Sequence, residues 1–156
     1  MNRTAKSYII IILLFFIVSG GFIPVKVVTI TTADGVARFV KMVHDGDTIM
    51  LSHINSIYDA KVEEVLRVEG LNFCLAEVKT DSYGVKEYYG ITEGIQPRSW
   101  KEIRFYNSAV RHFSLAVNDK EFNIRKFTDS LLIIKLQKTR LHKYFSLLIF
   151  KDCTLF

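Results

Sequence analysis

Beyond residue 24, apolar and polar residues alternate along most of the chain with a period of two, which is typical of half-buried β-strands. Turn-forming residues interrupt the alternation, for example at Asp45-Gly46-Asp47, Glu69-Gly70 and Asn118-Asp119. The predicted strands are Val25–Thr31, Val36–Val43, Asp47–Ile54, Lys61–Val68, Leu71–Thr80, Tyr83–Tyr89, Glu102–Tyr106, His112–Val117, Glu121–Ile124 and Leu131–Gln137. Short strands at this spacing predict an all-β domain, either an antiparallel β-sandwich or a flattened barrel.

Two of these strands carry polar side chains on a face that is otherwise apolar. The two faces read Ile49, Leu51, His53, Asn55 and Val62, Glu64, Leu66, Val68. Since successive side chains of a strand alternate between faces, each set points to one side of the sheet. A carboxylate, imidazole or amide on a core face is costly unless it finds partners. The pattern therefore indicates either a polar structural clasp, with Glu64 bound to His53, Asn55 or turn amides, or a contact site for a ligand or partner.

The same residues do not predict an enzyme. A catalytic triad would combine Ser52 or Ser56 with His53 and Glu64. Ser52 and His53 are neighbours on one strand, so they point to opposite faces, and the chain has no Gly-x-Ser-x-Gly elbow. Glu63 and Glu64 are adjacent too and cannot face each other as paired carboxylates. No spacing typical of metal ligands occurs, and we expect neither a metal nor a cofactor.

The N-terminus carries the longest apolar run of the chain. Tyr8 to Val18 contain no charged residue, and a short basic start with Arg3 and Lys6 precedes them. This layout is typical of a secretory signal, but counting on to Val25 gives about eighteen residues, the lower limit of a membrane span. A cleaved signal peptide and a retained anchor both stay open, and either one places the remaining chain at the extracytoplasmic face of the cell membrane.

The sequence therefore predicts three parts: a signal peptide or membrane anchor at 1–23, a β domain at 24–137 and a basic, aromatic extension at 138–156. Lysines and arginines surround the apolar run Tyr144 to Phe150 in the extension. A run of seven residues cannot span a bilayer. The run is either a last strand or a segment that rests on lipid headgroups beside the N-terminal anchor.

Charge and cysteine content narrow the possible partners. The net charge is +5, and omitting Arg3 and Lys6 leaves 19 basic and 16 acidic residues. This excess is too small to indicate nucleic-acid binding. Export would allow a disulfide between Cys74 and Cys153, but their positions favour two unpaired thiols.

Several short motifs together resemble a known family. The order Asn55-Ser56-Ile57-Tyr58, then Lys61-Val62-Glu63-Glu64 and Leu66, resembles the signature of the domain of unknown function 1850 family. That signature is a strand ending in His-Ser-Val, a short gap, then Pro-Val-x-Glu and an aromatic. Asp81-Ser82-Tyr83-Gly84-Val85 is similar to its Ser-Phe-Gly-Ala-Gly segment, and Glu102 to Phe105 and Leu131 to Leu136 are similar to its tail. The resemblance covers roughly Val25 to Leu136.

Two departures from the family pattern matter. Asn55 stands where the family usually has His, and Lys61 stands where it usually has Pro. The first departure removes a titratable group, although His53 on the same face is a candidate to supply the missing imidazole.

The resemblance implies a small exported or anchored protein with no assigned activity. By association with the family it would assist a TRAP-type transporter of the kind that uses TAXI solute-binding proteins, through contact with its permease or its solute-binding protein. The contact residues we expect are His53, Asn55, Ser56, Glu64, Ser82, Tyr83 and Gly84. The alternative is a free-standing module of the cell envelope that binds a small ligand, which a pocket beside Glu64 would favour.

Overall fold

The computed structural model describes residues 22–91, 94, 97–109 and 113–150. The signal or anchor predicted at 1–23 therefore lies, except for its last two residues, outside the described residues, and so does Cys153. Cys74 is a free thiol within the part of the chain that is described. No helix among the described residues is long and apolar enough to cross a membrane.

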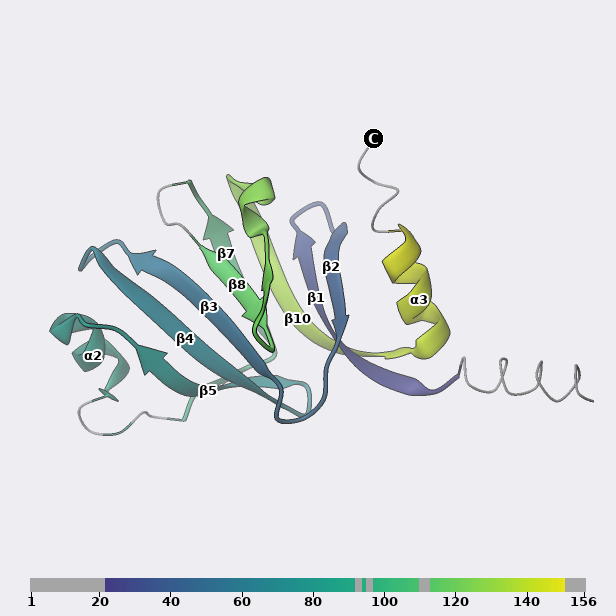
Figure 1. Cartoon of the computed structure of the whole chain (residues 1–156), viewed down its shortest axis with the longest axis horizontal. Helices are drawn as coiled ribbons and strands as arrows, with labels where there is room; N and C mark the ends of the chain where they lie inside the picture. The colour runs from purple at the N-terminus through teal and green to yellow at the C-terminus, as the bar shows by residue number, and fades with distance from the viewer. Residues whose placement is uncertain (1–21, 92–93, 95–96, 110–112, 151–156) are drawn as a thin grey trace, which may run out of the picture.

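The strands form two antiparallel sheets (Figure 1). The first, sheet A, has four strands in the order β2 (Ala37–Met42), β1 (Pro24–Thr32), β10 (Ser130–Arg140) and β7 (Glu102–Asn107). The second, sheet B, has six strands in the order β6 (Ser99–Trp100), β5 (Asn72–Lys79), β4 (Ala60–Glu69), β3 (Thr48–Asn55), β8 (Ser114–Val117) and β9 (Lys120–Phe122). The prediction of a mainly antiparallel β domain is confirmed.

One hydrophobic core joins the two sheets. From sheet A it takes alternate residues of β1 and β10, such as Ile30 and Ile134, which lie opposite each other in the antiparallel register. From sheet B it takes residues of β3, β4, β5 and β8, of which Ile49 and Leu66 are again opposite partners. Both sheets thus bury one face against the other, and this is why a period of two dominates the sequence.

The turn residues explain why the strands end where they do. Asn118 and Asp119 both have positive φ, 48° and 60°, between β8 and β9. Val117 pairs with Lys120 across them, so they form a two-residue hairpin of the type I′ kind. Gly46, with φ of 90°, takes the same left-handed region in the turn before β3.

Two predicted strands are helices instead. The predicted strand Tyr83–Tyr89 is wrong, because these residues form α2 (Tyr83–Tyr89). Ser82 caps its start by accepting a hydrogen bond from the amide of Val85, and Gly90 ends it in a left-handed conformation with φ of 67°. Val85 and Tyr89, four residues apart, are the buried side of this helix.

A last strand at Tyr144 to Phe150 is also wrong, because residues Leu141–Phe150 form α3. Leu141, Tyr144, Leu147 and Leu148 are its less exposed residues, at the spacing of one helical face. The helix packs on β1, β2 and β10. The strand β10 continues to Arg140, past the predicted boundary at residue 137.

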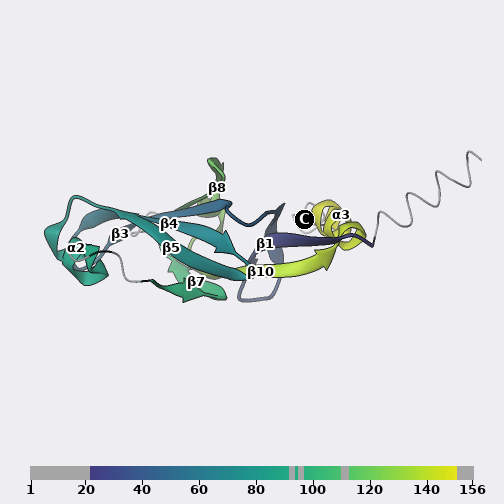
Figure 2. The same ribbon diagram turned by 90° about the horizontal axis from the view of Figure 1, so that it is seen from below.

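The two helices lie at opposite ends of an elongated molecule (Figures 1 and 2). Sheet B extends toward α2, and sheet A extends toward α3 and the start of β1. A hydrogen bond from the amide of Leu141 to the carbonyl of Ile23, 2.9 Å long, ties the start of α3 to the residues before β1. Any site near α2 is therefore far from the N-terminal end of the domain.

Candidate functional site

The register of β3 and β4 brings the polar residues of the two core faces together. Leu51 lies opposite Glu64, and His53 lies opposite Val62. The shared face predicted from the sequence is therefore present. The partner of Glu64, however, comes from neither of these strands.

Glu64 accepts a short hydrogen bond from the hydroxyl of Tyr89 at the end of α2. Burial, and after it the hydrogen bond to the Glu64 carboxylate, raises the pKa of Tyr89 far above its ordinary value. The phenol therefore keeps its proton and remains the donor. This contact fastens α2 to β4 and supports the structural interpretation of Glu64, with Tyr89 in the place expected for His53 or Asn55.

Asn55 shapes the turn between β3 and β4. Its side-chain oxygen accepts hydrogen bonds from the amides of Ile57, at 2.9 Å, and Tyr58, at 3.2 Å. This local pattern is an Asx turn, for which asparagine is among the preferred residues. Ser56 is exposed within the turn. Asn55 thus has a structural role in closing the turn.

Gly84 lets this turn contact α2. A Cβ atom at position 84 would lie 2.3 Å from Cε1 of Tyr58 and 2.8 Å from its Cδ1 and Cζ. Only glycine therefore allows the Tyr58 ring to lie where it does. Two predicted site segments, Asn55-Ser56 and Ser82-Tyr83-Gly84, are brought together by this packing.

The joined segments present exposed apolar and aromatic side chains, which we call the aromatic tip. Its members are Ile57, Tyr58, Tyr83 and Tyr88. Ile57 is 82% exposed and Tyr83 is 71% exposed. The guanidinium of Arg98 lies 5.9 Å from the ring centre of Tyr88 and 5.6 Å from that of Tyr89. These cation–π contacts help to hold the two rings in place.

His53 does not join the aromatic tip. Its ring stacks on Phe113, with ring centres 5.3 Å apart and an angle of 24° between the planes. Phe113 in turn packs against Phe105 of β7. The imidazole therefore belongs to the packing between the sheets and lies apart from the turn that Asn55 shapes.

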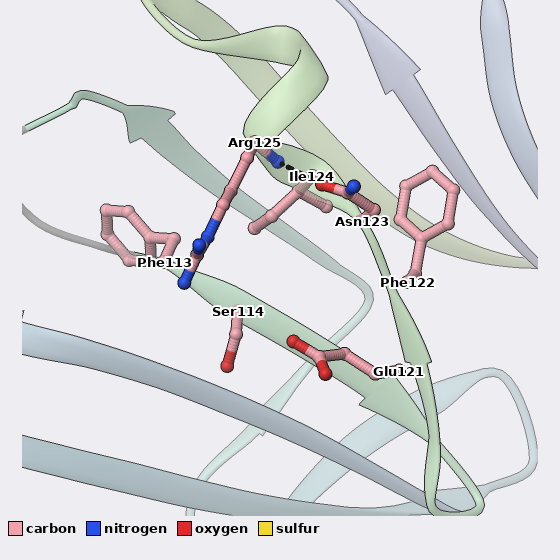
Figure 3. A pocket seen from close by; sticks show the side chains of 7 residues that line it. All are labelled: Phe113, Ser114, Glu121, Phe122, Asn123, Ile124 and Arg125. Atoms are coloured by element: carbon pink, nitrogen blue, oxygen red, sulfur yellow. Dashed lines mark hydrogen bonds between the residues drawn. The ribbon is translucent and has the colours of Figure 1, made fainter.

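A groove that the sequence analysis missed lies along β8, β9 and the 3₁₀ turn η2 (Ile124–Phe127) (Figure 3). Two adjoining hollows, of about 310 Å³ and about 500 Å³, share Ser114, Glu121 and Arg125. Figure 3 shows the side chain of Arg125 extending from η2 toward Phe113 and Ser114. The second hollow continues over the outer face of β3 and β4, past Ser52.

Buried and capping amides hold η2 at the edge of this groove. Asn107 is buried, and its side-chain nitrogen donates to the carbonyls of Ile124, at 2.7 Å, and Phe127, at 3.0 Å. Asn123 caps the turn by accepting from the amide of Arg125 at 3.2 Å. The groove offers hydrogen-bonding groups of both charges. They are the cations Lys61 and Arg125, the carboxylates of Glu63, Asp119 and Glu121, and the hydroxyls of Ser52 and Ser114.

Comparison with known proteins finds no matching family model and no significant match among curated proteins or solved structures. The geometry of the site thus carries the functional argument.

Sequence analysis missed Tyr89 and Arg125 for different reasons. Tyr89 reads as the end of an alternating run, although Ser82 and Gly90 at its two borders are a recognisable helix start and stop. Arg125 follows a short strand, and it comes close to Phe113 and Ser114 only because η2 folds back beside β8.

Proposed function

We propose that this protein is a contact protein of the cell envelope that presents the aromatic tip to a partner protein. The observation that carries the proposal is the set of exposed aromatic side chains at the α2 end of the domain. Aromatic residues are enriched in protein interfaces, and tyrosine is among the residue types that supply most of the binding energy. On a free surface they expose apolar area that a partner would cover.

The tip is also rigid, which favours binding. The Asx turn of Asn55, the contact between Tyr58 and Gly84, and the bond from Tyr89 to Glu64 each fix one part of it. A surface that is ordered before binding loses little conformational entropy when the partner docks. These contacts give structural roles to Asn55, Glu64 and Gly84, and they leave Ser56 and Tyr83 as predicted contact residues that face solvent.

The partner we propose is the permease or the solute-binding protein of a TRAP-type transporter. The resemblance of the turn and α2 segments to the domain of unknown function 1850 family supports this choice. We further propose that residues 1–23 anchor the chain or direct its export, and that the β domain acts at the extracytoplasmic face of the membrane.

Co-purification from native membranes tests this function. We expect the tagged full chain to recover a transporter component, and the double variant Tyr83→Ala/Tyr88→Ala to recover at least tenfold less, because each interface aromatic contributes more than about 1 kcal/mol. The control is Tyr106→Ala, an exposed tyrosine on β7. Equal recovery with the tip variant would refute contact through the tip, and a partner of another class would refute the transporter assignment.

The groove of Figure 3 favours a second function, the binding of a small ligand. Arg125 and the hydroxyls of Ser114 and Ser52 can bind a carboxylate, which a guanidinium binds with two parallel hydrogen bonds, and Glu63, Asp119 and Glu121 in the same groove can bind an amino group of the same ligand. We expect about 10 mM lysine to raise the melting temperature of the wild type but not of Arg125→Gln. An equal shift in the variant, or no shift in the wild type, would eliminate this function.

A further inference from the structure

Past the core, the residues of β10 change from apolar to basic. Leu132, Ile134 and Leu136 are buried on the inner face of this strand. The next residues of the same alternation, Lys138 and Arg140, are exposed. The strand thus runs out of the hydrophobic core and brings two cations to the end of the molecule where α3 lies.

These cations line a shallow hollow of about 410 Å³, together with Pro24, Thr139 and Lys143. Lys143 comes from the first turn of α3. Among the described residues, no acidic side chain lines this hollow and none of the three cations forms an ion pair. The hollow is therefore a positively charged site that an anion of phosphate size would complement.

Exposed apolar side chains lie on the same two segments as the hollow, the start of β1 and α3. Phe22 and Ile23 precede β1, Phe145 and Ile149 lie four residues apart on α3, and each of the four is more than half exposed. Phe22 joins the residues before β1 to the end of β10 and the start of α3. Its ring lies 5.3 Å from the guanidinium of Arg140 and 5.8 Å from the ring of His142. Cations beside exposed aromatic and aliphatic residues are typical of surfaces that lie at a lipid interface.

We propose that this end of the domain binds the headgroups of anionic phospholipids. The cations Lys138, Arg140 and Lys143 contact the phosphate, while Phe22 and Ile23 enter the boundary between headgroups and acyl chains. The inference rests on the proposed membrane anchoring, because the uncharged run Tyr8 to Val18 ends four residues before Phe22. That short connection places the hollow at the bilayer surface. It also sets α3 in the interface and leaves the aromatic tip at the distant end.

The test uses the full chain in lipid nanodiscs made of phosphatidylcholine alone or with about 30% phosphatidylglycerol. We expect the anionic lipid to slow amide hydrogen exchange in α3 about fivefold, which is the change produced by about 1 kcal/mol of added protection, the contribution of a single engaged cation such as Lys143. The effect should disappear in Lys138→Gln/Arg140→Gln/Lys143→Gln and weaken at high salt, since salt screens exposed charges. The matched control Lys79→Gln/Lys101→Gln/Lys120→Gln loses the same charge elsewhere and should behave as the wild type.

Equal exchange in both lipids, or an unchanged effect in the first triple variant, would overturn the proposal. Slowing of the same size by inorganic phosphate in neutral nanodiscs would assign the hollow to a free anion and overturn the lipid assignment. Flotation of the full chain with the two kinds of vesicle separates this failure from failure of the anchor. A chain that floats with both lipids but shows equal exchange keeps the anchor and loses the headgroup site. Flotation only with anionic vesicles keeps the headgroup site and refutes the anchor, and flotation with neither refutes both.

Discussion

The hydrogen bond from Tyr89 to Glu64 gives a measurable prediction about stability. Tyr89→Phe keeps the buried ring and deletes only the donor, so the Glu64 carboxylate loses its partner. A hydrogen bond to a charged group contributes about 1.5–3 kcal/mol, and Glu64 is only half-buried, so we take the lower end of that range. We expect the free energy of unfolding to fall by about 1.5 kcal/mol and the melting temperature to fall by about 5 °C.

The pH dependence of this effect has a definite sign. Because burial and the Glu64 carboxylate raise the pKa of Tyr89 in the folded protein, the unfolded chain releases this proton at lower pH. The contribution of protonated Tyr89 to the stability of the folded protein is therefore complete below the ordinary tyrosine pKa of about 10. It is lost as the pH rises above that value. The loss approaches about 1.4 kcal/mol for each pH unit while the folded protein still holds the proton.

Urea unfolding at about pH 7 and about pH 11 measures both parts of the prediction. The control is Tyr88→Phe, because Tyr88 is the exposed neighbour on the same helix and we expect no change from it. Glu64→Gln keeps an oxygen acceptor and should cost less than Tyr89→Phe. If Tyr89→Phe is as stable as the wild type at neutral pH, or loses as much stability at alkaline pH, Tyr89 does not fasten α2 through Glu64.

Two further predictions concern the turn between β3 and β4. Gly84→Ala should destabilise the wild type because its Cβ meets the Tyr58 ring, and in a Tyr58→Ala background it should be neutral or stabilising. A thermal double-mutant cycle should therefore give a coupling energy of about 1 kcal/mol between the two positions. Additive effects would show that the ring simply moves away. Asn55→Ala removes the acceptor for two amides and should lower the free energy of unfolding in urea by about 1 kcal/mol. Asn55→Asp keeps that acceptor and should lower it much less. Equal losses of stability in the two variants would contradict the Asx turn.

The sequence predicted the strands well because both sheets bury one face. In β3 and β4 the alternation of Ile49 and Leu51, and of Val62 and Leu66, is the direct consequence of that burial. Turn residues with positive φ, such as Asn118 and Asp119 between β8 and β9, mark where one strand ends and the next begins. Local information was sufficient for these elements.

The helices α2 and α3 could not be predicted in this way, because their apolar residues show no clear period. Tyr83–Tyr89 carries apolar residues at positions compatible with either period, and only the flanking Ser82 and Gly90 distinguish them. In α3 the apolar residues run almost without interruption, so no period can be read between Tyr144 and Ile149. The packing of α3 on sheet A decides which of its residues are covered.

The candidate site could be predicted only in part. That Glu64 needs a partner follows from its neighbours on β4, but the identity of that partner does not. Tyr89 lies 25 residues further along the chain and reaches Glu64 only because α2 folds back over the sheet. The grouping of Tyr58 with Gly84 depends on the same docking. Sequence therefore predicts the requirement, and tertiary structure supplies the residue that meets it.

The position of β1 has a mechanical consequence. The strand lies between β2 and β10, and all nine of its residues, Pro24 to Thr32, pair with β10. A pull on the residues before Pro24, resisted at the α2 end, loads β1 lengthwise. The register pairs then share the force in parallel and must yield together, whereas a pull that peeled the strand sideways would break them one after another. The domain is thus built to withstand tension applied through its N-terminus.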